Sequence, residues 1–293
     1  MIGAKSKFTK QYALYFSILF SVVSTFLEAQ TTGQTYAFAI SQSKMGNYDI
    51  AIKSLKRLQF FDESNNFPSV FQVLADCYYW KTDYENAYYY YDLAGVQIAN
   101  DSLLTEIVAS KVTCKLYSHQ YQQALIDLLS FDKQMNTFHQ WQFNMLFGIT
   151  YFYLGEIDQS EAYFMKTLDS ASPQLSKKLE LGFNQVRQVE KRYNPNTARM
   201  LSFIIPGSGQ IWAGDYRNGA NSFLLIAGLV SASVAISESI SLLDSIIIIA
   251  PWFQRYYMGG YQKAHEISLE KQLKEKNKIL AQIVHMLDQN VVR

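Results

Sequence analysis

Residues 71–91 have the sequence FQVLADCYYWKTDYENAYYYY, and this stretch decides the fold that we expect. Apolar and small side chains recur at helical spacing on both sides of the short polar segment Lys81–Asp83. This pattern predicts two helices joined by a tight turn. Ala87 supplies a small side chain where the two backbones would approach, and Tyr91, one turn later, supplies a large one to fill the space beside it.

The same pattern occurs four times along the chain. Each copy has a turn, then a small residue, and four positions later a large apolar residue. The turn segments recur every 36 or 37 residues and comprise Gly46–Ala51, Thr82–Ala87, His119–Ala124 and Gly155–Ser160. The large residues that follow them are Leu55, Tyr91, Leu128 and Phe164. A fixed period of this length is typical of helical repeat proteins.

These segments resemble the tetratricopeptide repeat, with the second and fourth copies matching best over residues 34–172. The resemblance implies an all-α fold, an α-solenoid of about four helical pairs. A helix over residues 174–193 is expected to cap the stack, which gives a repeat domain over residues 34–194. The alternative is a generic antiparallel helical bundle.

The resemblance also implies a concave groove lined by the first helix of each pair. The groove residues that it implies are Gln72, Asp76, Tyr79, Trp80, Tyr117, Met145, Ile149, Phe152 and Tyr153. Such a groove would be aromatic and nearly uncharged, which favours a protein or peptide partner held by aromatic anchors. Alternatively, these aromatic side chains pack neighbouring repeats together.

The first 29 residues have the pattern of an export signal. Lys5, Lys7 and Lys10 precede an uncharged run from Tyr12 to Leu27, and Ala29 is a plausible cleavage position. An uncleaved signal anchor is the alternative, although the run is short for a membrane span. In either case the repeats would be exported, which places them on the periplasmic side of a bacterial cell envelope.

Residues 198–260 are strongly apolar and predict a membrane-associated hairpin. Residues 219–237 carry no charge and are long enough to span a bilayer, and a shorter apolar run follows at 242–253. The turn Pro206–Gly214 (PGSGQIWAG) resembles the glycine- and aromatic-rich turn of TM2-type membrane domains. Its expected turn residues are Pro206, Gly207, Gly209, Gln210, Trp212 and Gly214. A very apolar helix pair in the core of a soluble domain is the alternative.

Residues 261–293 predict a C-terminal amphipathic helix, which could lie on lipid, pair with a partner helix or pack on the protein's own repeats. Its lysines favour a cytoplasmic tail under the positive-inside rule. That placement conflicts with two spans after an exported domain.

Composition and motif searches exclude several function classes. The near-neutral charge (26 basic and 25 acidic residues) argues against nucleic acid as a partner. The four histidines and the cysteines Cys77 and Cys114 form no catalytic or metal-ligand spacing, so we expect no cofactor, no metal and no enzymatic activity. The two cysteines are expected as buried free thiols, with a disulfide as the alternative. We therefore predict an envelope adaptor that binds a polypeptide and assists envelope protein assembly; the alternative is a transport component that uses Asp244 and the glycine-rich turn.

Overall fold

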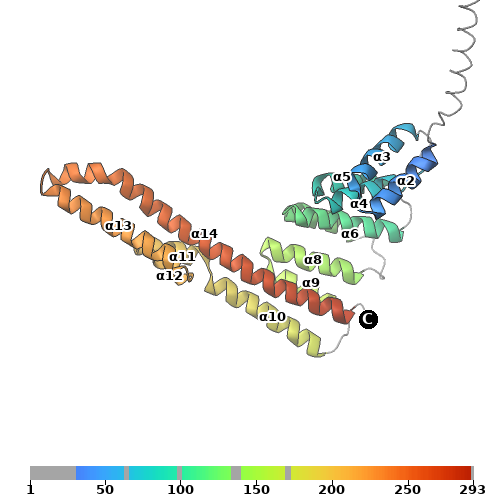
Figure 1. The fold of residues 1–293 in the computed structure, drawn as a ribbon. Helices are drawn as coiled ribbons and strands as arrows, with labels where there is room; N and C mark the ends of the chain where they lie inside the picture. The colour runs from blue at the N-terminus through green and yellow to red at the C-terminus, as the bar shows by residue number, and fades with distance from the viewer. Residues whose placement is uncertain (1–30, 63–65, 98–100, 133–139, 169–172, 292–293) are drawn as a thin grey trace, which may run out of the picture. The chain divides into compact units, whose positions relative to one another are not determined.

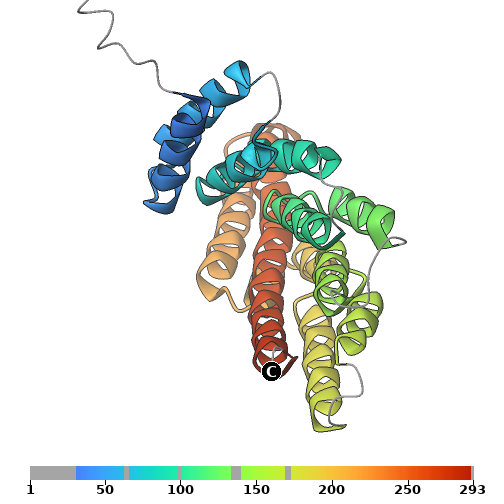
Figure 2. The same ribbon diagram turned by 90° about the vertical axis from the view of Figure 1, so that its right-hand side faces the viewer.

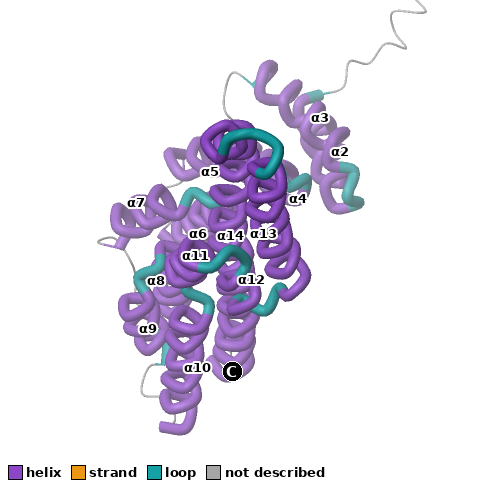
Figure 3. Tube along the Cα trace, turned by 90° about the vertical axis from the view of Figure 1, so that its left-hand side faces the viewer, coloured by secondary structure: helices purple, strands orange, loops and turns teal. Residues whose placement is uncertain are grey.

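The computed structural model describes residues 31–62, 66–97, 101–132, 140–168 and 173–291, so the predicted signal segment lies outside it. In these ranges the regular secondary structure is all helical, without strands, and the helices are joined by loops and turns (Figure 1; Figure 3). Two compact units divide between residues 137 and 138, inside the predicted repeat domain 34–194. The all-α class is therefore confirmed, and consecutive helices pack against one another as in a solenoid.

Unit 1 contains three successive helical pairs. Its helices are α2 (Thr32–Lys44), α3 (Tyr48–Phe61), α4 (Val70–Trp80), α5 (Tyr84–Gln97), α6 (Asp101–Tyr117) and α7 (Tyr121–Asp132). The helices pack within pairs, and α3 packs on α4 and α5 on α6. One continuous core runs through the first two pairs and reaches α6, with Leu55, Leu74 and Ile107 among its buried members.

The turn inside each pair has one recurring backbone conformation. Gly46, Thr82, His119 and Gly155 all have positive φ, between 57° and 85°. The next residue then donates its N–H to a carbonyl five positions earlier, as in Asn47 to Gln42 and Glu156 to Tyr151. This left-handed cap satisfies carbonyls that a helix end would otherwise leave unpaired. The period of 36 or 37 residues in the sequence therefore marks the positions at which the first helix of each pair ends.

The small and large residues of the repeated pattern are buried in all four copies. The four small residues and the four large residues are each at most 4% exposed; they are Ala51, Ala87, Ala124, Ser160, Leu55, Tyr91, Leu128 and Phe164. Their burial confirms the packing role that the spacing predicted, because close-packed helix pairs need small residues at the point of nearest approach.

Unit 2 contains the fourth pair and everything after it. Its helices are α8 (Gln140–Leu154), α9 (Ile157–Lys166), α10 (Pro173–Arg192), α11 (Pro195–Ile204), α12 (Ser208–Trp212), α13 (Tyr216–Ser237) and α14 (Leu242–Val291). Helix α14 packs along α13 and α11 with its first part and along α10 with its second part (Figure 1; Figure 2). The predicted boundary at 260/261 lies inside this single helix, with no break there.

Candidate functional site

Four aromatic side chains of unit 1 form a cluster that we call the aromatic patch: Tyr79, Trp80, Tyr84 and Tyr117. The rings of Tyr84 and Tyr117 stack with centroids 5.0 Å apart, and Tyr79 meets Tyr117 at 6.1 Å and Trp80 at 5.7 Å. Trp80 is 65% exposed and Tyr117 55% exposed. The structure thus brings together three residues that the resemblance assigned to a groove. Tyr84 was missed, although tyrosine also follows the turn at residues 48 and 121.

Asp76, also a predicted groove residue, is engaged inside the unit. The Tyr91 hydroxyl donates to Asp76 Oδ1 at 2.6 Å. Burial raises the pKa of the Asp76 carboxyl, and the Tyr91 hydrogen bond opposes that rise. Burial raises the pKa of Tyr79 in the aromatic patch to about 12. Gln72 is partly exposed on the same helix. Asp76 therefore serves α4–α5 packing, which the sequence pattern did not reveal.

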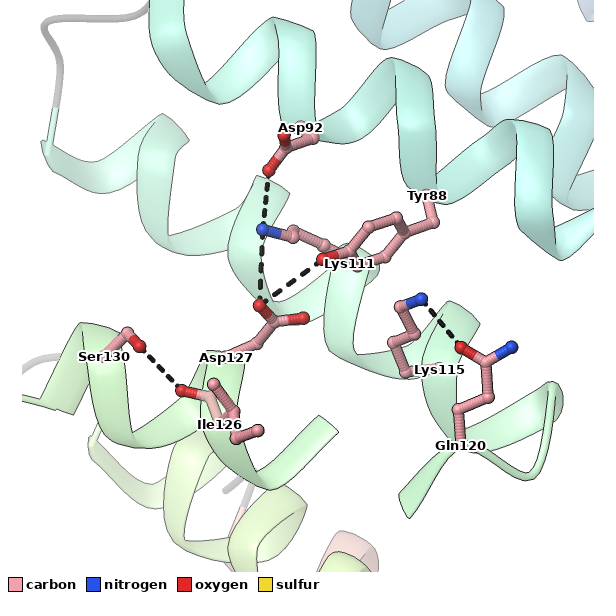
Figure 4. Close-up of polar contacts among 8 residues, drawn as sticks. All are labelled: Tyr88, Asp92, Lys111, Lys115, Gln120, Ile126, Asp127 and Ser130. Atoms are coloured by element: carbon pink, nitrogen blue, oxygen red, sulfur yellow. Dashed lines mark hydrogen bonds and ion pairs between the residues drawn. The ribbon is translucent and has the colours of Figure 1, made fainter. Parts of the chain in front are cut away.

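A polar network joins α5, α6 and α7 (Figure 4). Lys111 Nζ lies 2.6 Å from Asp92 and 3.4 Å from Asp127, and Lys115 Nζ lies 3.8 Å from the centre of the Tyr88 ring. Burial alone would lower the pKa of Lys111, but the Asp92 hydrogen bond and the charge of Asp127 raise it. The charges compensate one another, so this network fits a role in holding the helices together.

In unit 2, the predicted groove residues pack against the core of the unit, and Phe152 among them is buried. Phe152 is 2% exposed, and Met145, Ile149 and Tyr153 pack against the same core cluster. Helix α14 contributes Leu280, Ile283 and Leu287 to this cluster. The expectation of an open groove at Phe152 is therefore wrong, because an amphipathic helix of the same chain buries that ring.

Polar contacts fix this part of α14. Lys276 Nζ lies 2.5 Å from Glu190 Oε1 and 5.2 Å from the Phe152 ring centre. The Gln272 amide donates to the backbone carbonyls of Glu190 and Tyr193, at the end of α10. Of the three placements left open for the C-terminal helix, packing on the protein's own helices is the one observed.

The predicted turn motif forms a tightly packed junction between α11, α12 and α14. Gln210 is 1% exposed; its Oε1 accepts from the Ser202 hydroxyl at 2.6 Å, and its Nε2 donates to the Gly260 carbonyl at 2.8 Å. The Gly209 N–H donates to Ser202 Oγ at 2.9 Å. A Cβ at Gly209 would overlap the Ala198 carbonyl, so this approach requires glycine.

The remaining motif residues surround this junction. Gly207 has φ 89° and its Cα faces the backbone of Gly219, while Pro206 is partly buried beside it. Gly214 adopts the left-handed cap of the repeat turns, with the Asp215 N–H donating to the Gln210 carbonyl. Trp212 is 39% exposed. The motif therefore has a buried centre, formed by Gly207, Gly209 and Gln210, and an exposed end that carries Trp212 and Gly214.

We call α13 and residues 242–260 of α14 the apolar hairpin. Unlike the helix pairs of a water-soluble protein, it carries large apolar side chains on its outer surface. Its helix contact includes small residues: Ser222 faces Gly260, and the hydroxyl oxygens of Ser233 and Ser245 lie 3.5 Å apart. Ile226 is the large aliphatic side chain of α13 that is buried. Large aliphatic side chains point outward, with Leu224 65% exposed and Ile247 69% exposed. Within the described residues, one helix, α13, has the length and apolar composition of a membrane span.

Other candidate chemistry is not assembled in the described ranges. Cys77 and Cys114 are free and buried, and burial raises the pKa of the Cys114 thiol to about 12. No group of three His, Cys, Asp or Glu side chains that could hold a metal occurs there. Asp244 lies in the first turn of α14, exposed, and accepts a hydrogen bond from Ser241.

Comparison with known proteins gives no match for this chain among family descriptions, curated proteins or solved structures.

Proposed function

We propose that this protein is a membrane-anchored scaffold of tetratricopeptide type, exported to the bacterial envelope, that binds a polypeptide through the aromatic patch of unit 1. The recurring left-handed turns and the buried small and large residues of four helical pairs support the repeat assignment. The pattern of residues 1–29 supports export.

The main support for membrane attachment is the outer surface of the apolar hairpin, where large aliphatic side chains are exposed. In water, leaving a large aliphatic side chain exposed forgoes about 1.5–3 kcal/mol of burial free energy. The hairpin exposes many such side chains while it buries Ser245 and brings Ser222 against Gly260. In lipid this arrangement is favourable, because the outer surface is solvated by hydrocarbon and small residues allow close helix approach. A bilayer therefore explains the surface better than water does.

Contacts within unit 2 support a return across the membrane. If α13 crosses, the second part of α14 still packs on α10, which precedes α13, through Lys276–Glu190 and Gln272–Tyr193. Both ends of the hairpin then lie on one side, so residues 242–260 form the return crossing. The lysines of the tail would lie on the same side as the fourth helical pair, and compact folding would outweigh the positive-inside preference.

The aromatic patch supports polypeptide binding. Tryptophan and tyrosine are enriched at the energetic centres of protein interfaces. Trp80 and Tyr117 remain exposed after the repeats have packed, whereas Phe152, in the other part of the predicted groove, is covered by α14. Partner binding is thus assigned to unit 1. No observation favours a transport role for Asp244, which lies at the exposed start of α14.

Membrane attachment is tested by carbonate extraction and by protease accessibility. One tag is inserted at residue 64 and another follows Arg293. We expect the protein to stay in the carbonate-resistant membrane fraction and both tags to be cut from the same side. Release into the soluble fraction would show that the hairpin is not a membrane anchor.

Partner binding is tested by placing a photo-crosslinking amino acid at Trp80 and, as a control, at Phe60, which is 79% exposed on α3. We expect a discrete polypeptide adduct from residue 80 that weakens in a Tyr117→Ala background. Equal adducts from residues 80 and 60 would contradict a binding surface at the aromatic patch.

A further inference from the structure

A groove lined by α11 and by Tyr261 of α14 lies beside the apolar hairpin. It measures about 440 Å³, within the range of small-molecule sites, and is lined by Asn196, Arg199, Met200, Phe203, Ile204 and Tyr261. One end is polar and carries Asn196 and Arg199. The other end is formed by Phe203 and Ile204, which are 58% and 72% exposed.

Arg199 supplies an uncompensated cation to this groove. Its guanidinium lies 5.3 Å from the centre of the Tyr261 ring. Among the described residues, no carboxylate forms a salt bridge with it. A planar guanidinium held on an aromatic face keeps its hydrogen-bond donors directed outward and is well suited to bind a phosphate group.

The order of residues along α11 determines which end of the groove lies nearer the apolar hairpin. Phe203 packs on Tyr257 of the apolar hairpin, and the Tyr257 hydroxyl donates to the Phe203 carbonyl. Arg199 lies about one helical turn, roughly 6 Å, farther from the hairpin. With the hairpin in a bilayer, as proposed above, the polar end would lie at headgroup depth and the apolar end at acyl-chain depth. Tyr257 and Tyr261 match the aromatic side chains found at membrane interfaces.

We propose that this groove binds one anionic glycerophospholipid, with the phosphate on Arg199 and an acyl chain along Met200, Phe203 and Ile204. The site rests on the proposed membrane attachment and adds a specific lipid to it. The bound lipid fills the gap between α11 and the bilayer and anchors the junction at which the hairpin joins the repeats.

The test uses the full chain, purified from membranes in micelles that contain equal phosphatidylglycerol and phosphatidylcholine. Retained lipid is quantified after extensive detergent washing. We expect preferential retention of phosphatidylglycerol, reduced about tenfold by Arg199→Ala, the effect of losing one charge-assisted contact. Arg192→Ala is the matched control, because Arg192 also lies over a tyrosine, Tyr193 at 5.4 Å, outside the groove.

Two further arms separate the sources of binding. Ile204→Gln should reduce retention, whereas Ile248→Gln, an equivalent change on the exposed hairpin surface, should leave it unchanged. Inorganic phosphate should not displace the lipid; displacement would identify a phosphate-ion site and overturn the proposal. Equal retention by wild type and Arg199→Ala, or no headgroup preference, would overturn the lipid site while leaving membrane attachment intact. Extraction of the protein from membranes by carbonate would overturn both the lipid site and the proposed membrane attachment.

Discussion

The ring of Phe164 on α9 lies against the Cα of Gly148 on α8, so closely that a Cβ at residue 148 would be 2.8 Å from two of its ring carbons. Ser160 strengthens the same contact, because its hydroxyl donates to the Gly148 carbonyl at 2.8 Å. The fourth helical pair thus depends on a glycine, a serine and a phenylalanine whose spacing is visible in the sequence.

Gly148→Ala should lower the free energy of unfolding by about 1–3 kcal/mol, the usual cost of overpacking. Phe164→Leu in the same chain should recover part of this loss, which thermal unfolding of the two single variants and the double variant would measure. Gly228→Ala is the control, since no side chain approaches that position. Strict additivity of the two changes would contradict the contact.

Thr82→Gly should stabilise unit 1. A left-handed conformation costs a residue with a side chain about 1–2 kcal/mol, and glycine avoids this cost while losing about 0.5–1 kcal/mol in chain entropy. We expect a net gain between about 0 and 1.5 kcal/mol in urea unfolding. Gly155→Ala, at the equivalent turn, should have the opposite sign. His119 is less suitable for this test, because its ring forms a hydrogen bond with the Tyr121 hydroxyl at 2.7 Å, which a substitution by glycine would also remove.

Asp76→Asn should stabilise the protein increasingly as pH rises. Burial raises the folded pKa of Asp76 above its reference value of 3.8, so the folded state binds this proton more tightly than the unfolded state. The contribution of Asp76 to stability is complete below pH 3.8, where the carboxyl is protonated, and it is lost as pH rises through the folded pKa of Asp76. The difference between the variant and wild type should therefore be larger at about pH 7 than at about pH 4. Glu85→Gln, on an exposed carboxylate of α5, is the control.

Ile283→Asp should detach the C-terminal part of α14 from the fourth pair. Ile283 is 4% exposed and contacts Gly182, so the substitution places an unpaired charge in the core at a cost of at least about 2 kcal/mol. We expect faster proteolysis after residue 271 and binding of a hydrophobic dye. Leu273→Asp, at a position 45% exposed, should have neither effect.

Gln210→Ala should destabilise the α11–α12–α14 junction by about 1–3 kcal/mol, because it leaves the buried Ser202 hydroxyl without its acceptor. Gln210→Glu keeps an acceptor for the Ser202 hydroxyl, but it should be more damaging, because it replaces the donor to the Gly260 carbonyl by a buried carboxylate. Hydrogen exchange of Gly209 and its neighbours would report the change. An unchanged exchange rate in both variants would rule out the bridging role; exposed Gln262→Ala is the control.

Sequence periodicity was sufficient to predict the helical pairs, because their signals are local. Thr82–Ala87 and Gly155–Ser160 contain the turn and the small contact residue within six positions. Three residues of the aromatic patch were also named from the sequence, since the repeat resemblance implied Tyr79, Trp80 and Tyr117, and Tyr79 contacts the other two rings in the structure. Tyr84 could have been included, because a tyrosine recurs after the turn.

Long-range packing was not predictable in the same way. The face around Phe152 is closed by residues about 130 positions later, and amphipathic character alone does not say whether a helix covers lipid, a partner or its own chain. The sequence alone determined the all-α class, the period, the glycine-rich turn and the apolar composition of residues 219–237, because these depend on neighbours within a few turns of helix. Only the tertiary structure decided that α14 is one helix, that Gln210 joins Ser202 to Gly260 and that Leu280, Ile283 and Leu287 cover the fourth pair, because burial is a property of the whole packed chain.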